Sequence, residues 1–220
     1  MTEAEWLECK DAQMLVDFAS GKASDRKLRL FACACCRQIW DQMPDSRTRN
    51  AVVIAESLAD GIRDFSDLDS AHRLAQERAL EVGDVLQLAA QAGVIIVRNS
   101  EPLDVARDVV RTAGLVAARM AWSDAATDDE ARANAAAVWA QIASLLRHIV
   151  GNPFRSNGPP AFWPSTVTQL ADALYSGQDC EFALHDALLD AGHADLAEHF
   201  SQEKWHPKGC WALDLLLGKE

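Results

Sequence analysis

The chain has 220 residues, of which 49% are hydrophobic, and a formal net charge of −12. This length is enough for one domain or two small domains with a sizeable core, and the composition is typical of globular rather than disordered proteins. The acidic excess disfavours a phosphate backbone as the main partner, so we expect no binding to nucleic acid.

Neither export nor membrane insertion is expected. No apolar run approaches the roughly 20 residues that span a bilayer, and the first residues, Met1-Thr-Glu-Ala-Glu, are acidic where a signal peptide would be positive. The sequence therefore predicts a cytoplasmic protein. In that reducing compartment the six cysteines are expected to be thiols, core residues or metal ligands rather than disulfides.

Caps and breakers divide the first 150 residues into consecutive helices. An apolar stripe from Trp6 to Phe18 predicts the first helix, which ends at Gly21. The later helices of this part are expected to begin at or just after Ser24, Ser46, Ser66, Ser100 and Thr127. The run Gly93-Val-Ile-Ile-Val97 is the only β-like segment, and we interpret it as buried helix because no second strand is evident to pair with it.

A breaker-rich segment, residues 151–160, separates this part from a set of shorter helices. These helices are expected at about 165–176, 179–190, 194–201 and 207–217. The sequence thus predicts an all-α fold with an N-terminal multi-helix bundle over 1–150, a linker rich in proline and glycine over 151–164, and a smaller helical C-terminal unit over 165–220. The C-terminal unit could also pack on the bundle as one domain.

Four side chains that can bind zinc lie within eighteen residues near the C-terminus: His193, His199, His206 and Cys210. Pro207 suits the first turn of the last helix, which would place His206 and Cys210 across one helical turn. Asp214, one turn further, could accept a hydrogen bond from a ligating imidazole. Four such ligands fit a closed tetrahedral zinc site, whereas ordinary packing of histidines and a buried cysteine is the alternative interpretation.

Cysteines are also clustered near the N-terminus. Cys33 and Cys36 share one face of a predicted helix and could offer two ligands to a metal. The alternative is core packing, because free cysteine is among the most buried residue types. Cys35 is expected to point toward the core.

Several segments resemble a paralogous family of planctomycete proteins of unknown function. They are residues 1–7, 21–37, 151–155, 171–174 and 206–219. This resemblance implies a fold relationship and no reaction type. In the family pattern a cysteine stands where this chain has His193, and the remaining pattern resembles His199, His206, Cys210 and the pair Cys35–Cys36. The resemblance therefore implies a zinc site in which Cys35 or Cys36 could replace one of the C-terminal ligands.

Signatures of catalysis are few. The chain has no G-x-S-x-G, P-loop, dinucleotide fingerprint or H-E-x-x-H motif. We therefore expect a helical protein that acts by binding another protein, with a structural zinc site. The alternative is a metal-dependent enzyme of the zinc hydrolase type that uses the C-terminal histidine and cysteine cluster.

Overall fold

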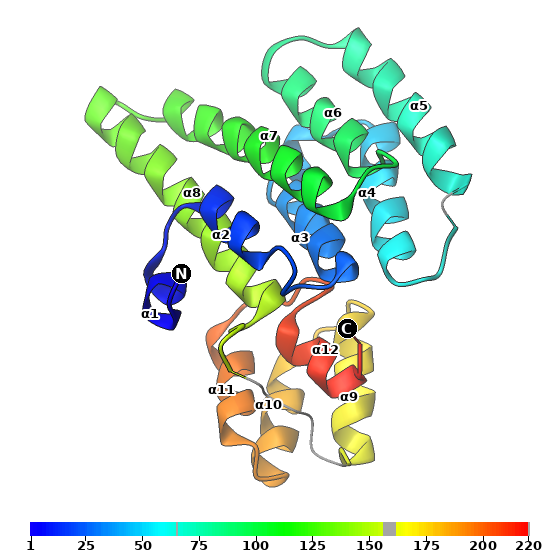
Figure 1. Cartoon of the computed structure of the whole chain (residues 1–220), viewed down its shortest axis with the longest axis vertical. Coiled ribbons are helices and arrows are strands. Elements are labelled where there is room, and N and C mark those ends of the chain that lie inside the picture. Colours follow the sequence, from blue (N-terminus) through cyan, green and yellow to red (C-terminus); the bar gives the residue numbers. More distant parts are fainter. Residues whose placement is uncertain (65, 156–161, 220) are drawn as a thin grey trace. The chain divides into compact units, whose positions relative to one another are not determined.

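The computed structural model describes residues 1–64, 66–155 and 162–219. Within these ranges the secondary structure is helical throughout, with no strand, which confirms the predicted all-α class (Figure 1). The α-helices of the described chain are α1 (Glu3–Glu8), α2 (Ala12–Ala19), α3 (Asp25–Gln38), α4 (Ser46–Ala59), α5 (Ser66–Glu81), α6 (Asp84–Ile96), α7 (Pro102–Ser123), α8 (Asp128–Val150), α9 (Ser165–Tyr175), α10 (Glu181–Asp190), α11 (Ala194–Gln202) and α12 (Trp211–Leu217). A short 3-10 helix covers Trp40–Gln42.

The chain forms two compact units, Met1–Arg147 and His148–Glu220. The boundary lies inside α8, so the last turn of this helix belongs to the second unit. The described part of the segment 151–164, which we expected to be a linker, also belongs to the second unit. No helix in the described residues has the length and apolarity needed to cross a membrane.

The first unit is built around α3, which packs against α4, α6 and α7. Nine residues of α3 are buried, including Cys33, Cys35 and Cys36. Glycine permits two close helix contacts in this unit. A Cβ at Gly93 would lie 2.5 Å from Cγ2 of Thr48 in α4, and a Cβ at Gly114 in α7 would overlap the indole of Trp139 in α8.

The helix starts confirm some of the predicted boundaries and correct others. Ser24 caps α3 as predicted, since its Oγ accepts a hydrogen bond from the Lys27 N–H at 3.3 Å. The first apolar stripe, however, is divided into α1 and α2, because Asp11 caps a new helix by accepting from the Met14 N–H at 3.0 Å. Helix α4 begins at Ser46, as predicted, and Asp45 is its N-cap. Residues 93–96 lie in α6, which confirms the helical interpretation of that run.

The second unit consists of the last turn of α8 and the short helices α9 to α12. Helix α10 packs against α9 and α11, and α12 packs against α9. Their shared core holds buried side chains from every one of these four helices: Val167, Ala171, Leu174, Leu184, Leu188, Ala197, Phe200, Ala212, Leu213 and Leu216, together with Cys210 at the start of α12. A core of this size gives a unit of about 70 residues little stability by itself, and such units commonly rely on an additional crosslink or metal.

Candidate metal site

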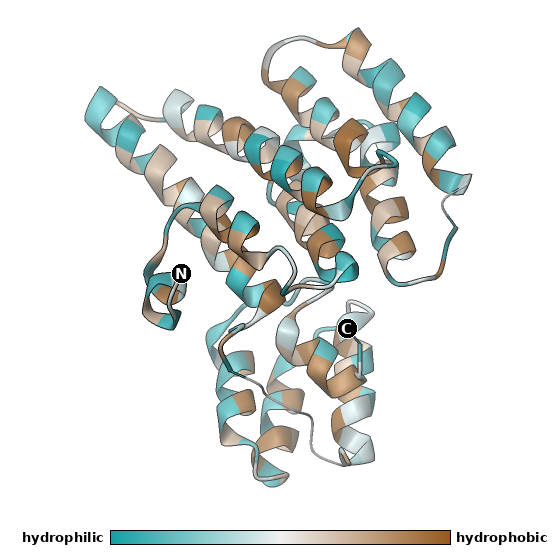
Figure 2. Ribbon diagram, in the orientation of Figure 1, coloured by the Kyte–Doolittle hydropathy of each residue, from teal (hydrophilic) through white to brown (hydrophobic). Residues whose placement is uncertain are grey.

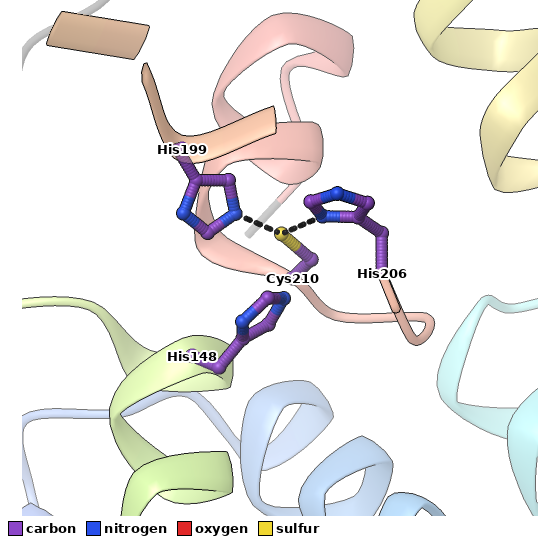
Figure 3. A group of neighbouring side chains, drawn as sticks. All are labelled: His148, His199, His206 and Cys210. Atoms are coloured by element: carbon purple, nitrogen blue, oxygen red, sulfur yellow. Dashed lines mark hydrogen bonds between the residues drawn. The ribbon is translucent and has the colours of Figure 1, made fainter. Parts of the chain in front are cut away.

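Three of the residues predicted from the C-terminal sequence, His199, His206 and Cys210, come together in the second unit. A fourth side chain, His148, joins them (Figure 3). One ligand atom from each residue lies within 4.8 Å of the ligand atoms of the other three. The group therefore contains three imidazoles and one thiol, and it could hold a metal ion.

The approach of His206 to Cys210 comes from a tight turn. The Cys210 N–H donates to the Pro207 carbonyl at 3.0 Å, and Gly209 adopts a positive φ of 86°. We expected a helix from residue 207, but α12 begins at Trp211 and Cys210 is its N-cap. Residues 207–209 thus form a turn, in which the Cys210 Sγ still lies 3.8 Å from the His206 Nδ1.

His199 projects from α11 toward the same thiol. Its Nε2 lies 3.2 Å from the Cys210 Sγ. Helix α11 is fixed in the core by Phe200 and Ala197, both buried, so the neighbouring His199 is presented on a helix with a defined orientation. Figure 3 shows His199 and His206 approaching the sulfur from opposite sides.

His148 comes from the last turn of α8 and completes the group. Its ring centroid lies 4.8 Å from that of His199 and 5.5 Å from that of His206. The His148 Nδ1 also lies 3.7 Å from a carboxylate oxygen of Glu203, at the C-cap of α11. A carboxylate beside one ring nitrogen is a common way to orient a histidine whose other nitrogen binds a metal.

Two of the donor–donor distances can be compared with those of a tetrahedral zinc site. With Zn–N bonds of about 2.05 Å and a Zn–S bond of about 2.3 Å, a regular tetrahedron has N–S edges of about 3.6 Å and N–N edges of about 3.4 Å. The two N–S distances, 3.2 and 3.8 Å, lie on either side of this edge length. The four ligand atoms lie within 4.8 Å of one another, so the group would contract to bring all of them into bonding distance of one ion.

Burial keeps two of the imidazoles neutral. Loss of solvent, with a smaller contribution from the neighbouring His206, lowers the pKa of His199 to about 4. Loss of solvent also lowers the pKa of His206 to about 4, opposed by the backbone of Glu203. A neutral imidazole has a nitrogen lone pair to donate to a metal, whereas an imidazolium has none. At neutral pH both histidines are thus in their metal-binding form.

Aromatic side chains surround the group. The Phe200 ring centroid lies 4.8 Å from that of His206, and the Trp211 centroid lies 5.2 Å from that of His199. The Cys210 side chain is fully buried. An apolar shell of this kind lowers the local dielectric, which strengthens the attraction between a thiolate and a metal cation.

The other residues proposed from the sequence lie elsewhere. His193 is outside the group and packs its ring against Trp163, with the centroids 4.8 Å apart. Cys35 and Cys36 are core residues of α3 in the first unit, where burial raises the pKa of Cys36 to about 12 and that of Cys35 well above its usual value. Asp214 is buried in α12, and its backbone N–H donates to the Cys210 carbonyl at 2.9 Å.

Sequence spacing could not identify His148, which is 51 residues before His199. One signal was present, however. His148 interrupts the apolar stripe that includes Leu145, Leu146 and Ile149 in α8, and a histidine on a buried stripe needs a polar partner. Comparison with known proteins adds no assignment, because no family model, curated protein or solved structure matches the chain.

Proposed function

We propose that this protein is a zinc-binding helical protein, in which His148, His199, His206 and Cys210 hold one structural zinc ion. The observation that carries the proposal is the convergence of four ligand atoms within 4.8 Å of one another. Imidazole nitrogen and thiolate sulfur are the donors that zinc prefers in proteins, and four protein ligands complete its tetrahedral shell.

A structural role fits the surroundings of the site better than a catalytic one. Four protein ligands leave no position for a substrate or a water molecule. The ligands also come from three separate places in a small unit: the end of α8, helix α11 and the turn before α12. A single ion would tie these segments together, and binding energy of this kind acts as folding energy.

The role that we infer for the whole chain is the binding of another protein in the cytoplasm. A thiolate ligand is stable in a reducing compartment, which supports the proposed location. The motifs of the common enzyme classes are absent from the sequence, and the net charge of −12 opposes binding to polyanions.

A metal-dependent hydrolase remains the second candidate, and Glu203 is the residue that favours it. Its carboxylate is half exposed and lies 3.7 Å from His148. If only three side chains bound the metal, a water molecule could occupy the fourth position, and a carboxylate at the edge of the site could accept its proton. The number of protein ligands separates the two candidates: four indicate a structural site, and three with a bound water indicate catalysis.

Metal analysis of the purified chain tests the proposal. We expect about one zinc per chain in protein produced with zinc in the medium, and a large loss in His199→Ala and in Cys210→Ala. His193→Ala is the matched control, because it removes a nearby histidine outside the group. Zinc-free wild-type protein that also fails to take up added zinc would contradict the proposal, as would equal losses in the control and the ligand variants.

The protein-binding role is tested by crosslinking and affinity capture from an extract of the source cells. We expect a protein that is captured at a fixed ratio to the chain. Reproducible turnover of a substrate that is lost in Cys210→Ala would instead support the hydrolase.

A further inference from the structure

The charge of the second unit is concentrated in one long stretch of the sequence. Residues 156–203 contain eight acidic residues and no lysine or arginine. Most of these acids lie on or beside α9, α10 and α11, where Asp172, Asp179, Asp186, Asp190, Asp195, Glu198 and Glu203 are exposed. A surface with a single sign of charge attracts a partner of the opposite sign and repels others.

Helix α10 carries exposed apolar side chains beside its own exposed acids, Asp186 and Asp190. Phe182 is 78% exposed and Leu189 is 47% exposed, while Leu184 and Leu188 on the other side are buried. Phe182, Asp186 and Leu189 are spaced i, i+4 and i+7 and so share one face of the helix. In Figure 2, α10 accordingly alternates between hydrophobic and hydrophilic positions along its length. We call this set of three residues the α10 face.

Neighbouring contacts hold two members of the α10 face in place. The ring of His185 stacks on Phe182 with the centroids 6.2 Å apart, and the His185 Nδ1 lies 3.0 Å from an Asp186 carboxylate oxygen. An exposed aromatic ring that is already oriented loses less conformational entropy when it binds. Aromatic anchors of this kind contribute much of the energy at protein interfaces.

We propose that the α10 face binds a basic amphipathic helix of a partner protein. The apolar side of the partner would cover Phe182 and Leu189, and its lysines or arginines would approach Asp186, Asp190 and the other exposed acids. Nucleic acid does not fit this surface, because the carboxylates repel phosphates. This inference rests on the proposed protein-binding role and does not depend on the metal.

The test uses the full zinc-treated chain and two synthetic helical peptides. One peptide has leucine on one side and lysine on the other, and the second has glutamate in place of every lysine. Fluorescence anisotropy of labelled peptide is expected to show binding of the lysine peptide, weakened by added salt, and no binding of the glutamate peptide. Failure of the lysine peptide to bind at low salt would overturn the inference.

Variants show whether the α10 face is the binding site. We expect Phe182→Ser combined with Leu189→Ser to weaken binding of the lysine peptide at least tenfold. Leu80→Ser is the matched control, because Leu80 is 80% exposed but lies on α5 in the first unit. It is expected to leave the affinity within twofold. Equal affinity of the α10 variant and the control would overturn the inference.

A second pair of variants tests the role of charge. Asp186→Asn combined with Asp190→Asn is expected to weaken binding several-fold at low salt and less at high salt. Asp128→Asn combined with Asp129→Asn makes the same charge change on α8 in the first unit and is expected to have little effect. Equal losses in the two pairs would show that the peptide senses only net charge, which would overturn the inference.

Affinity capture with the same α10 variant separates failure of this inference from failure of the proposed function. Loss of the captured protein in Phe182→Ser with Leu189→Ser, but not in Leu80→Ser, would support the α10 face. A protein captured equally by wild type and by the α10 variant would overturn the α10 face and leave the protein-binding role intact. If wild type captures no protein and the lysine peptide does not distinguish the α10 variant from the control, both proposals fail.

Discussion

Glu203 is expected to increase the affinity of the site for zinc through His148. Its carboxylate oxygen lies 3.7 Å from the His148 Nδ1. If the Nε2 of His148 binds the zinc, the Nδ1 is the ring nitrogen that remains for a second partner. An accepting carboxylate fixes the ring orientation and makes the ligating nitrogen more basic. Replacing Glu203 with glutamine keeps the shape of the side chain and removes its charge.

The structure sets the size of the effect. Removing a carboxylate that supports a metal-binding histidine typically costs about 10- to 100-fold in metal affinity. The Glu203 side chain is 50% exposed, so solvent screens its interaction with His148. We therefore expect a loss near the lower end of that range, about tenfold, which corresponds to about 1.4 kcal/mol.

Competition with a chelator of known zinc affinity measures this loss. Glu198→Gln is the matched control, because it removes the same charge from α11, whose C-cap is Glu203. The Glu198 carboxylate accepts a hydrogen bond from the Gln202 amide at 2.6 Å. It is expected to change the zinc affinity less than twofold. Wild-type zinc affinity in Glu203→Gln, or an equal loss of affinity in both variants, would refute this role of Glu203.

Three further outcomes follow from the structure. Chelation of the metal is expected to speed amide hydrogen exchange in α9 to α12 and to leave the exchange in α3 unchanged. A ligand present at 100 times its Kd stabilises the folded state by about 2.7 kcal/mol, and chelation would remove this stabilisation from the second unit. In metal-free protein the free energy of unfolding should fall as the pH drops from about 6.5 to about 4. His199 and His206 have a pKa of about 4 in the folded state, so over this pH range the same two side chains bind protons in the unfolded chain before they do so in the folded chain. Chemical denaturation over this pH range should show a loss of at most about 3 kcal/mol per histidine, and a pH-independent stability would contradict the burial of both rings. Gly114→Ala should lower the melting temperature, because the added methyl group overlaps Trp139 and destabilises the folded state by about 1–3 kcal/mol, although alanine normally favours a helix. A rise in the melting temperature would show that the indole can move aside.

The helical class could be predicted because local signals determine it. Ser24 caps α3, and residues 93–96 are helical as their apolar run and lack of a partner strand indicated. One helix boundary was missed, because the apolar stripe from Trp6 to Phe18 continues across it. Asp11 lies within that stripe and begins α2 by accepting a hydrogen bond from the Met14 N–H.

Local sequence identified only part of the candidate site. His199, His206 and Cys210 belong to one short segment, so their proximity could be anticipated from spacing. His148 reaches the group through the packing of the second unit, which spacing along the chain does not reveal. His193 lies near the other ligands in sequence, but it is the N-cap of α11, and its ring contacts Trp163 instead.

X-ray absorption at the zinc edge of the metal-loaded chain tests the central claim most directly, because it reports the ligands themselves. We expect four ligands, with three nitrogens at about 2.0–2.1 Å and one sulfur at about 2.3 Å, and we expect the sulfur shell to disappear in Cys210→Ser. A wild-type spectrum with no sulfur at bonding distance, or with five or six light-atom ligands, would contradict a closed site formed by His148, His199, His206 and Cys210.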